Sequence, residues 1–230
     1  MPSALPKGAN SPSHARLLLI DLEDATECSV LFDQRVLCGW GEEQIPAWRE
    51  SARNGERAMF WISLPPETRT DDGPILKRGA EAFVPAGHVS LDRVDDPGPG
   101  VDPDPTLAAP DGSVLTISNI FVLPAFSGGG LGRFTMRECE RLAQQEPYGN
   151  PNCRYLSLWT LSERYAAGGE GGWDGIGRWE RLGKPVPKRA NGPWYESLGY
   201  VKYKEEIRLY WGLPNEPMAW YGAFFRKELR

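Results

Sequence analysis

The stretch ISNIFVLPAFSGGGLGRFTMREC, from Ile117 to Cys139, limits what this chain can fold into more than any other feature. An apolar run ends at a proline, four glycines follow within five residues, and a helical pattern then begins. Residues 114–123 predict a buried central strand. Residues 131–144 predict a helix, because their apolar side chains recur on one face at a 3.6-residue period. A plain turn rarely needs so much glycine, so this turn is a candidate binding loop.

Bulk composition excludes several classes of protein. The chain has 230 residues, 40% of them hydrophobic and 25% charged, which is ordinary for a globular protein. A net charge of -5 and a pI near 5.2 argue against a nucleic-acid partner. Four cysteines without a CxxC pair and only two histidines argue against a zinc site, so we expect no metal. We expect the four cysteines to be isolated, buried thiols, as is typical of a reducing compartment.

The first residues carry no targeting signal that we can identify. Residues 1–13 are rich in Pro, Ser, Gly and Ala and predict a flexible N-terminal tail. They contain no apolar core of a signal peptide, and LLLI at 17–20 is too short to span a bilayer. We therefore expect a cytoplasmic protein without a membrane partner.

The order of the expected elements predicts one α+β domain over residues 14–230. The strand at 114–123, the helix after it and the next strand form a βαβ unit, and the other strands suit an antiparallel arrangement. Residues 65–82 and 95–113 read as turn and loop, and 162–193 as irregular. The expected strands are 16–22, 57–64, 83–94, 114–123, 153–161, 200–211 and 218–229; the expected helices are 25–40, capped by Asp24, 42–55, stopped by Gly55, and 131–144.

The glycine-rich turn suits an anionic ligand, since the first N–H groups of a helix have no intrahelical partner. A nucleotide-binding P-loop would need a lysine where Arg133 stands. A dinucleotide-binding dehydrogenase would need a glycine at the same position. Both alternatives are therefore weak, and a third diphosphate-binding class has to be considered.

Two motifs resemble the GNAT superfamily of N-acetyltransferases. The segment VLPAFSGGGLG resembles its acetyl-CoA signature, R/Q-x-x-G-x-G/A after V-x-P, with Gly130 and Gly132 at the glycine positions. Ser127 stands where the family usually has Arg or Gln. The segment WYESLGYVKYKEE is similar to the family's F-Y-x-x-x-G-F motif, with Tyr195 and Gly199 aligned. The resemblance extends from about residue 16 to the end of the chain.

The resemblance implies a GNAT fold: a mixed, mostly antiparallel sheet with a central splayed pair of strands and flanking helices. Acetyl-CoA would be the cosubstrate, its pantetheine arm pairing with the strand before the turn and its pyrophosphate resting on main-chain amides. Tyr195 would return a proton to the departing thiolate, unless it only packs against the core. The implied cofactor-binding residues are Phe121, Val122, Ser127, Gly128, Gly129, Gly130, Leu131 and Gly132.

The rest of the candidate site is less specific. His88 is a candidate general base because imidazole titrates near neutrality, the alternative being a packed strand histidine. Asn119 is a candidate for positioning the substrate. Glu42 and Glu43 are candidates for attracting a cationic amine, the alternative being a solvated helix start. Residues 162–193 form either a lid or a surface insertion.

Two functions follow from these residues and the resemblance. The first is an acetyl-CoA-dependent N-acetyltransferase that acts on a primary amine of a small molecule or a protein. The second is a non-catalytic module that binds an acyl-CoA, which the serine at position 127 keeps open. The sequence does not identify the acceptor and is compatible with a monomer or a homodimer.

Overall fold

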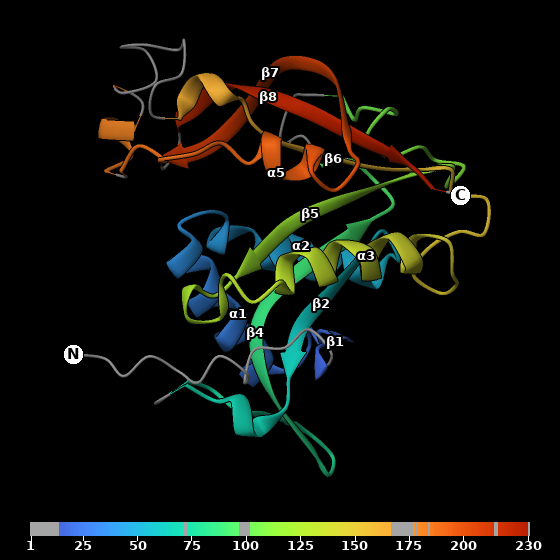
Figure 1. Cartoon of the computed structure of the whole chain (residues 1–230), viewed down its shortest axis with the longest axis vertical. Helices are drawn as coiled ribbons and strands as arrows, with labels where there is room; N and C mark the ends of the chain where they lie inside the picture. Colours follow the sequence, from blue (N-terminus) through green and yellow to red (C-terminus); the bar gives the residue numbers. More distant parts are fainter. Residues whose placement is uncertain are drawn as a thin grey trace. The chain divides into compact units, whose positions relative to one another are not determined.

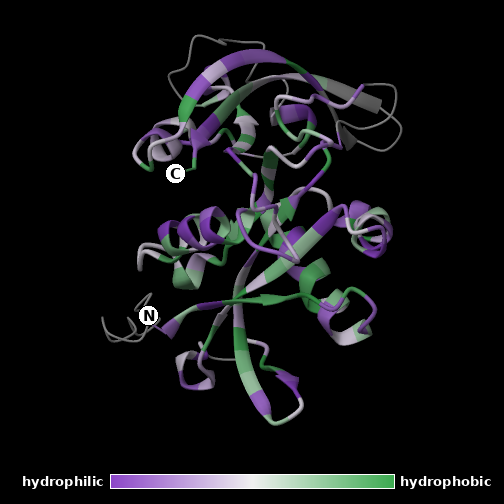
Figure 2. Cartoon of the chain, turned by 90° about the vertical axis from the view of Figure 1, so that its right-hand side faces the viewer, coloured by the Kyte–Doolittle hydropathy of each residue, from purple (hydrophilic) through white to green (hydrophobic). Residues whose placement is uncertain are grey.

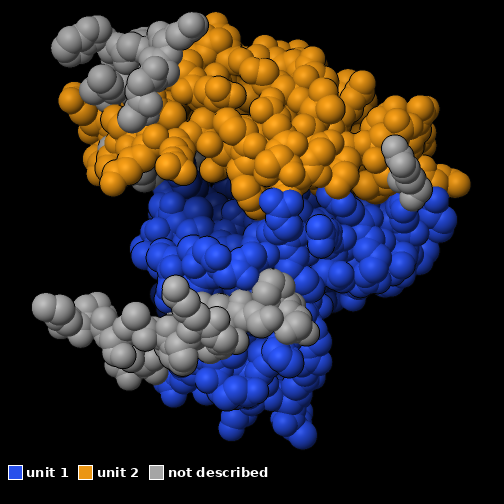
Figure 3. All heavy atoms as spheres, in the orientation of Figure 1, with its two compact units in different colours: residues 1–92, 117–151 blue, residues 93–116, 152–230 orange. Residues whose placement is uncertain are grey.

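The computed structural model describes residues 14–70, 73–96, 102–166, 177, 179–183, 185–213 and 216–229, without the side chains of 209–213 and 216–218. Two compact units emerge: residues 1–92 with 117–151, and residues 93–116 with 152–230 (Figure 3). The expected N-terminal tail lies outside the described residues. The prediction of a single domain over residues 14–230 therefore stays a prediction.

Unit 1 contains the α-helices α1, α2 and α3 and the strands at the β1 end of the sheet (Figure 1). Its strands are hydrogen-bonded in the order β1-β2-β4-β5, and β3 pairs with β4. The β1/β2, β2/β4 and β3/β4 pairs are antiparallel. The elements are β1 (Arg16–Leu19), α1 (Ala25–Cys38), η2 (Glu42–Gln44), α2 (Ile45–Arg53), β2 (Arg57–Leu64), η3 (Pro66–Thr68), β3 (Leu76–Arg78), β4 (Glu81–Asp92), the carboxyl-terminal part of β5 (Val114–Val122), η4 (Pro124–Phe126) and α3 (Leu131–Ala143).

Strand β2 explains how unit 1 builds its core. Because side chains alternate across a strand, Met59 and Trp61 pack with Leu31 of α1 and Trp48 of α2. Ile62 and Leu64 belong to a second cluster that includes Leu131 of α3, Phe126 and Val84. The strand is therefore apolar almost throughout, which is the pattern of a strand covered on both faces. Figure 2 shows long green stretches along the strands of this unit.

Unit 2 is built on three further strands. Strand β5 pairs in parallel with β6 through Val114–Thr116, and β6/β8 and β8/β7 are antiparallel. Its buried aromatic residues include Trp220, Phe224 and Phe225. The elements are the amino-terminal part of β5, β6 (Tyr155–Leu161), η5 (Glu163–Tyr165), α5 (Gly192–Glu196), β7 (Val201–Leu213) and β8 (Glu216–Glu228).

The predicted α+β class and the mostly antiparallel sheet are confirmed, with β5 as the middle strand of the hydrogen-bonded order. The Asp24 cap is confirmed as well, since its carboxylate accepts from the Thr26 and Glu27 amides at 2.8 Å. Residues 65–82 were expected to be turn material in a long hairpin connection; they do join the antiparallel strands β2 and β4, but they also contain β3, which was not expected. Strand β3 forms a hairpin with β4 through a two-residue turn, in which Gly79 takes a φ of 60°.

Two further expectations need correction. The expected strand at 16–22 is shorter, because β1 ends at Leu19 and the chain turns toward α1. The expected irregular region 162–193 includes η5 and the start of α5, a five-residue helix with a proline in its first turn. Part of that region lies outside the described residues, so its role as lid or insertion stays open.

The four cysteines are free thiols. Cys139 and Cys153 are buried, whereas Cys28 and Cys38 are half-buried, so burial of all four is only partly confirmed. Burial raises the pKa of the Cys139 thiol, which keeps it protonated. No helix among the described residues has the length and apolar character needed to cross a membrane.

Candidate functional site

The glycine-rich turn forms the start of α3. Gly128 and Gly130 take φ values of 84° and 86°, a left-handed conformation that costs glycine little. Gly130 is the N-cap of α3 and makes no side-chain capping bond. A Cβ added at Gly128 would meet nothing within 4 Å, so the turn is open around that residue.

The main-chain N–H groups of this turn are available. In the described part of the chain, no hydrogen bond has the N–H of any of residues 128–133 as its donor. The first donor of the helix is Phe134, whose N–H reaches the Gly130 carbonyl at 3.0 Å. Six consecutive amides therefore have no internal acceptor at the start of α3, where the helix dipole favours an anion.

Ser127 differs from the other residues predicted for this loop. Its N–H donates to the Pro124 carbonyl at 3.2 Å, and its hydroxyl donates to the Leu123 carbonyl at 3.3 Å. Its polar groups are thus engaged inside the turn. These contacts weigh against the expectation that the Ser127 amide contributes to anion binding, and for residues 128–132 that role stays a prediction.

The end of β5 lies against β4 at a glycine. A Cβ on Gly87 would stand 2.2 Å from the Phe121 carbonyl oxygen, so only glycine allows this approach. The Leu123 N–H donates to the Ala86 carbonyl at 2.9 Å. Because C=O and N–H point in opposite directions across a trans peptide, the Val122 N–H points away from β4. Among the described residues of unit 1 no strand lies beyond that edge of β5, so the edge at Phe121 and Val122 has no strand partner there.

Asn119 interrupts the regular strand. Its φ of 53° is the one positive value among the described non-glycine residues. Such backbone is rare in a strand and is most often tolerated by Asn. Its side chain lies 3.5 Å from the Ser90 hydroxyl, a weak contact. The local kink changes the direction of the neighbouring main-chain groups in the strand predicted to hold the cosubstrate.

His88 is fully buried and engaged at both ring nitrogens. The Gln34 amide nitrogen donates to the Pro85 carbonyl at 2.7 Å, which turns the amide oxygen toward His88. Nδ1 therefore donates to that oxygen at 2.8 Å, and Nε2 accepts from Arg35 Nη1 at 3.3 Å. Burial, and then the charge of Arg35, hold the pKa of His88 well below its usual value. These contacts weigh against the general-base role, which stays an untested prediction.

Arg35 and Gln34 were not anticipated from the sequence. Both are buried polar residues of α1, and the Arg35 guanidinium lies 5.3 Å from the centroid of the Trp48 ring. No carboxylate of the described residues pairs with Arg35, whose buried Nε has no hydrogen-bond partner. The residue pattern of the helix did not predict the contacts of either side chain. Gly87 did offer a signal for the close approach of β4 and β5, because glycine inside a strand often marks such an approach.

Glu42 and Glu43 lie where the sequence predicted, at the start of the second helical region. They form η2 directly before α2, with Glu42 half-buried and Glu43 exposed. The segment follows α1, the helix that packs over His88. Their attraction for a cationic amine stays a prediction.

Tyr195 lies in α5 and belongs to unit 2. It is 5% exposed and its ring packs with Trp194, Tyr200 and Phe225, at centroid distances of 4.9, 6.2 and 5.9 Å. Burial raises the pKa of the phenol above its usual value, so the group is protonated at neutral pH. It can donate a hydrogen bond, as a thiolate-protonating residue must, and its packing also fits a structural role.

Comparison with solved structures gives consistent similarities, although no family model matches the chain and no curated protein matches it in sequence. One similar structure is an aminoglycoside 6'-N-acetyltransferase complexed with coenzyme A, at 12% identity and a TM-score of 0.50, covering 94% of this chain and 97% of that chain. Another is spermidine N-acetyltransferase from Vibrio cholerae in complex with CoA and spermine, at 8% identity, a TM-score of 0.51 and coverage of 94% and 96%.

A third similar structure is Arabidopsis thaliana NAA60 in complex with a bisubstrate analogue, at 11% identity, a TM-score of 0.52 and coverage of 94% and 99%. All three similarities extend over nearly the whole of both chains. At such low sequence identity they support a shared fold and nothing beyond it. Together with the glycine turn between β5 and α3, they show that the chain has the fold of the GNAT N-acetyltransferases.

Proposed function

We propose that this chain is an acetyl-CoA-dependent N-acetyltransferase that acts on a primary amine. The observation that carries the proposal is the set of unpartnered amides at residues 128–133, at an exposed and positively polarised helix start. A diphosphate is the anion that such a set binds without a charged side chain. The fold similarity to structures solved with CoA supports the same assignment.

The residues of unit 1 suit the two ends of the cosubstrate. The amides of residues 128–132 would hold the pyrophosphate. The free edge of β5 at Phe121 and Val122 would pair with the pantetheine arm as if that arm were an added strand. The cosubstrate supplies an activated acetyl thioester. The Val122 N–H, which points away from β4, would stabilise the negative charge that develops on the carbonyl oxygen.

Proton transfer is assigned to fewer residues. Tyr195 would donate a proton to the departing thiolate, and its raised phenol pKa keeps that proton available. Because both nitrogens of His88 have partners, deprotonation of the amine falls to solvent, while Glu42 and Glu43 raise the local concentration of ammonium ions. The chain would then bind and orient the thioester for attack.

The second candidate is an acyl-CoA-binding module without turnover. The observation that favours it is the fully engaged His88, which leaves no evident base beside Phe121. Titration calorimetry with acetyl-CoA and a thiol-release assay on an amine panel separate the two. Binding without release of CoA from any amine would establish the module.

A charge placed in the glycine turn tests the shared part of both candidates. Gly129 has no positive φ, so Gly129→Glu should fold. We expect it to weaken acetyl-CoA binding at least about 100-fold, because a carboxylate repels the pyrophosphate among the unpartnered amides. Gly129→Gln is the matched control of similar size and should lose much less. Equal affinity of the wild type and Gly129→Glu in calorimetry would refute the cofactor site.

A further inference from the structure

Arg35 of α1 is a buried cation that no carboxylate of the described residues neutralises. The residue is 5% exposed. Its Nη1 donates to His88 Nε2 at 3.3 Å, and its Nε is buried without a hydrogen-bond partner. Its Nη2 makes no hydrogen bond either but, unlike Nε, is not enclosed. The edge of the guanidinium that Nε and Nη2 form therefore has no acceptor among the described residues.

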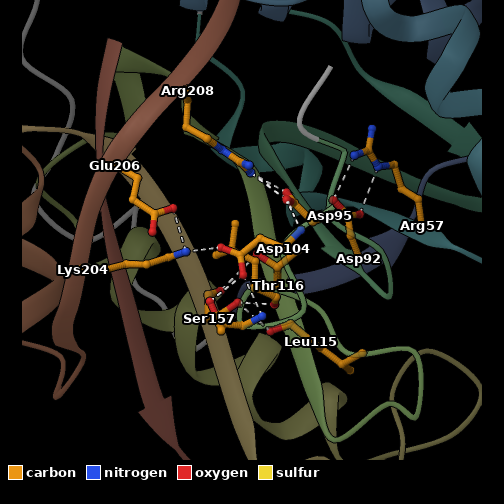
Figure 4. Close-up of polar contacts among 12 residues, drawn as sticks. Arg57, Asp92, Asp95, Asp104, Leu115, Thr116, Ser157, Lys204, Glu206 and Arg208 are labelled. Atoms are coloured by element: carbon orange, nitrogen blue, oxygen red, sulfur yellow. Dashed lines mark hydrogen bonds and ion pairs between the residues drawn. The ribbon is translucent and has the colours of Figure 1, made fainter. Parts of the chain in front are cut away.

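Three other arginines of unit 1 use the same edge to bind a carboxylate. Each donates from Nε and Nη2 to the two oxygens of one acid, at distances between 2.7 and 3.0 Å. The fork of two N–H groups matches the geometry of a carboxylate. Arg35 presents the same fork without an acid. The three pairs are Arg53 with Glu23, Arg78 with Glu27, and Arg57 with Asp92, the last of which Figure 4 shows.

The surroundings of Arg35 contain more positive than negative charge. The guanidinium groups of Arg35 and Arg57 lie 5.3 and 5.4 Å from the centroid of the Trp48 ring. The one carboxylate there, Asp92, is already bound to Arg57. A buried ion needs a hydrogen-bonded partner of opposite charge to offset its lost hydration, and a cation–π contact offsets only part of that loss. The unpaired edge of Arg35 therefore suits an anion that comes from outside the chain.

Gly41 leaves the space beside this edge open. A Cβ at Gly41 would stand 3.2 Å from Arg35 Nη2, closer than an ordinary contact. Gly41 is also the N-cap of η2, so Glu42 and Glu43 follow it directly. Neither of these acids forms an ion pair with Arg35. The carboxylates nearest to the edge in the chain thus leave it to another acid.

Contacts link Arg35 to the strand that would hold the thioester. Arg35 Nη1 contacts His88, and the centroids of the His88 and Phe121 rings lie 5.7 Å apart. Phe121 is one of the two residues proposed to lie along the pantetheine arm. One imidazole therefore separates the guanidinium from this part of β5. An amine on the same small molecule as a bound carboxylate would lie within reach of the strand.

We propose that Arg35 binds a carboxylate of the acceptor through Nε and Nη2, so that the substrate is an amine that also carries a carboxylate. This inference rests on the proposed acetyltransferase function, which specifies only a primary amine. Glu42 and Glu43 would attract the ammonium end of the same molecule. The proposed substrate differs from the spermine that the name of one similar structure prints, because spermine has no carboxylate.

The first test uses the full chain, acetyl-CoA and amines that differ only in their charge at the far end. Glycine, 3-aminopropionate and 4-aminobutyrate offer three spacings, and each is compared with its own amide by thiol release. At least one acid should exceed its amide in kcat/KM by about 10-fold, because a hydrogen bond to a charged group is strong. Arg35→Gln should abolish this preference, and Arg35→Lys, which keeps the charge without the fork, should retain part of it. Arg53→Gln is the control, since Arg53 pairs with Glu23 at the surface.

A pair of glycine variants tests the open edge without changing Arg35. Gly41 and Gly55 both have a φ of 72°, so alanine meets the same backbone strain at either position. Only at Gly41 does the new Cβ approach Arg35, whereas at Gly55 it meets nothing within 4 Å. Gly41→Ala should therefore raise the KM for the preferred acid by about 5-fold, and Gly55→Ala should not. Acetyl-CoA affinity should stay unchanged in both.

The melting temperature gives a readout that needs no turnover. A ligand that binds the folded protein raises it, so the preferred acid should do so in the wild type and not in Arg35→Gln. Its amide, at the same ionic strength, should have no effect. If no amine is turned over, each of the three acids is tested in this way. Should Arg35→Gln fail to fold, Gly41→Ala replaces it in both measurements.

Each outcome has a defined meaning. Equal kcat/KM for every acid and its amide overturns the inference and leaves the acetyltransferase function standing. So does a preference that Arg35→Gln keeps, or a Gly41→Ala variant that behaves like Gly55→Ala. Loss of acetyl-CoA binding in calorimetry is a failure of the proposed function itself. In that case, a rise in melting temperature that is specific to an acid and lost in Arg35→Gln still supports a carboxylate site, and its absence overturns that site as well.

Discussion

His88 illustrates how a residue with catalytic chemistry can serve the fold. Imidazole is useful in catalysis when one nitrogen can take a proton at neutral pH. Here Gln34 accepts from one nitrogen and Arg35 donates to the other, beneath the Trp61 and Phe121 rings. The neutral ring therefore links α1 to β4. Its position beside Phe121 lets it orient the strand that would hold the thioester.

The lowered pKa of His88 makes stability depend on pH. The folded protein keeps the ring neutral, so the unfolded chain binds a proton there first as the pH falls below about 6.5. The free energy of unfolding should then decrease, by at most about 1.4 kcal/mol per pH unit for this group. His88→Asn keeps a donor for Gln34 and cannot titrate. Its urea-unfolding free energy should fall less between pH 7.5 and 5.5 than that of the wild type, and equal falls would contradict the assignment.

Tyr195 can be tested without disturbing its packing. Tyr195→Phe keeps the ring among Trp194, Tyr200 and Phe225 and removes only the hydroxyl. If the phenol protonates the thiolate, kcat should fall by about 100-fold, since general acids typically contribute that much or more. Acetyl-CoA affinity and the melting temperature should stay close to the wild-type values. A variant with unchanged kcat would assign Tyr195 to the core.

Strand β5 shows how one element carries both structure and ligand contacts. Its first three residues pair with β6, and its end approaches β4 so closely that Gly87 has room for hydrogen only. The positive φ of Asn119 lies between these two regions. β4 and β6 lie on opposite edges of β5, and the edge at Val122 has no partner strand because the pairing with β6 ends at Thr116.

The close approach at Gly87 predicts a large effect from one methyl group. Gly87→Ala would place Cβ 2.2 Å from the Phe121 oxygen, and moving either strand should cost about 2–3 kcal/mol. Because β5 would shift, acetyl-CoA affinity should fall as well. Gly177→Ala, where a Cβ meets nothing within 4 Å, is the control. Thermal unfolding and calorimetry provide the two measurements, and a wild-type melting temperature for Gly87→Ala would contradict the described register.

At the scale of the whole molecule, each unit has its own buried aspartate–arginine pair. In unit 1, Asp92 accepts two hydrogen bonds of 3.0 Å from Arg57 (Figure 4). In unit 2, Arg208 Nη2 donates to both oxygens of Asp95, at 2.6 and 2.8 Å. The loop that begins at Asp95 is also held by Asp104, which forms an ion pair with Lys204. Ion pairs thus hold two described residues of the Asp/Pro-rich stretch, Asp95 and Asp104.

The pair in unit 2 provides a test of the single-domain prediction. Asp95→Ala leaves the buried Arg208 without its carboxylate, which should cost about 3 kcal/mol and lower the melting temperature by about 6–12 °C. Because β5 contributes residues to both units, we expect one cooperative transition that shifts as a whole. Calorimetry that resolves two transitions, of which only one moves, would show that the units are separate domains.

Local patterns in the sequence determined most elements of this protein and the glycine-rich turn before α3. The Asp24 cap, the apolar run of β2 and the glycines before α3 each depend on neighbours in the chain, so their conformations follow from propensity and periodicity. The short hairpin at β3 was missed because its Gly79 turn joins two weakly apolar segments. The free amides followed from the missing side chains alone.

Only the tertiary structure decided what the polar residues do. The sequence made His88 a candidate base, and the structure adds that Gln34 and Arg35 of α1, more than 50 positions away in sequence, contact its two nitrogens. Gly87 and Phe121, or Leu37 and Leu123, likewise meet through packing between distant elements. A side chain's protonation and the shape of a cavity are set by whatever surrounds them in space. For that reason the glycine-rich turn before α3 could be predicted from the chain, whereas the contacts of His88 and the close approach at Gly87 emerged only from the folded protein.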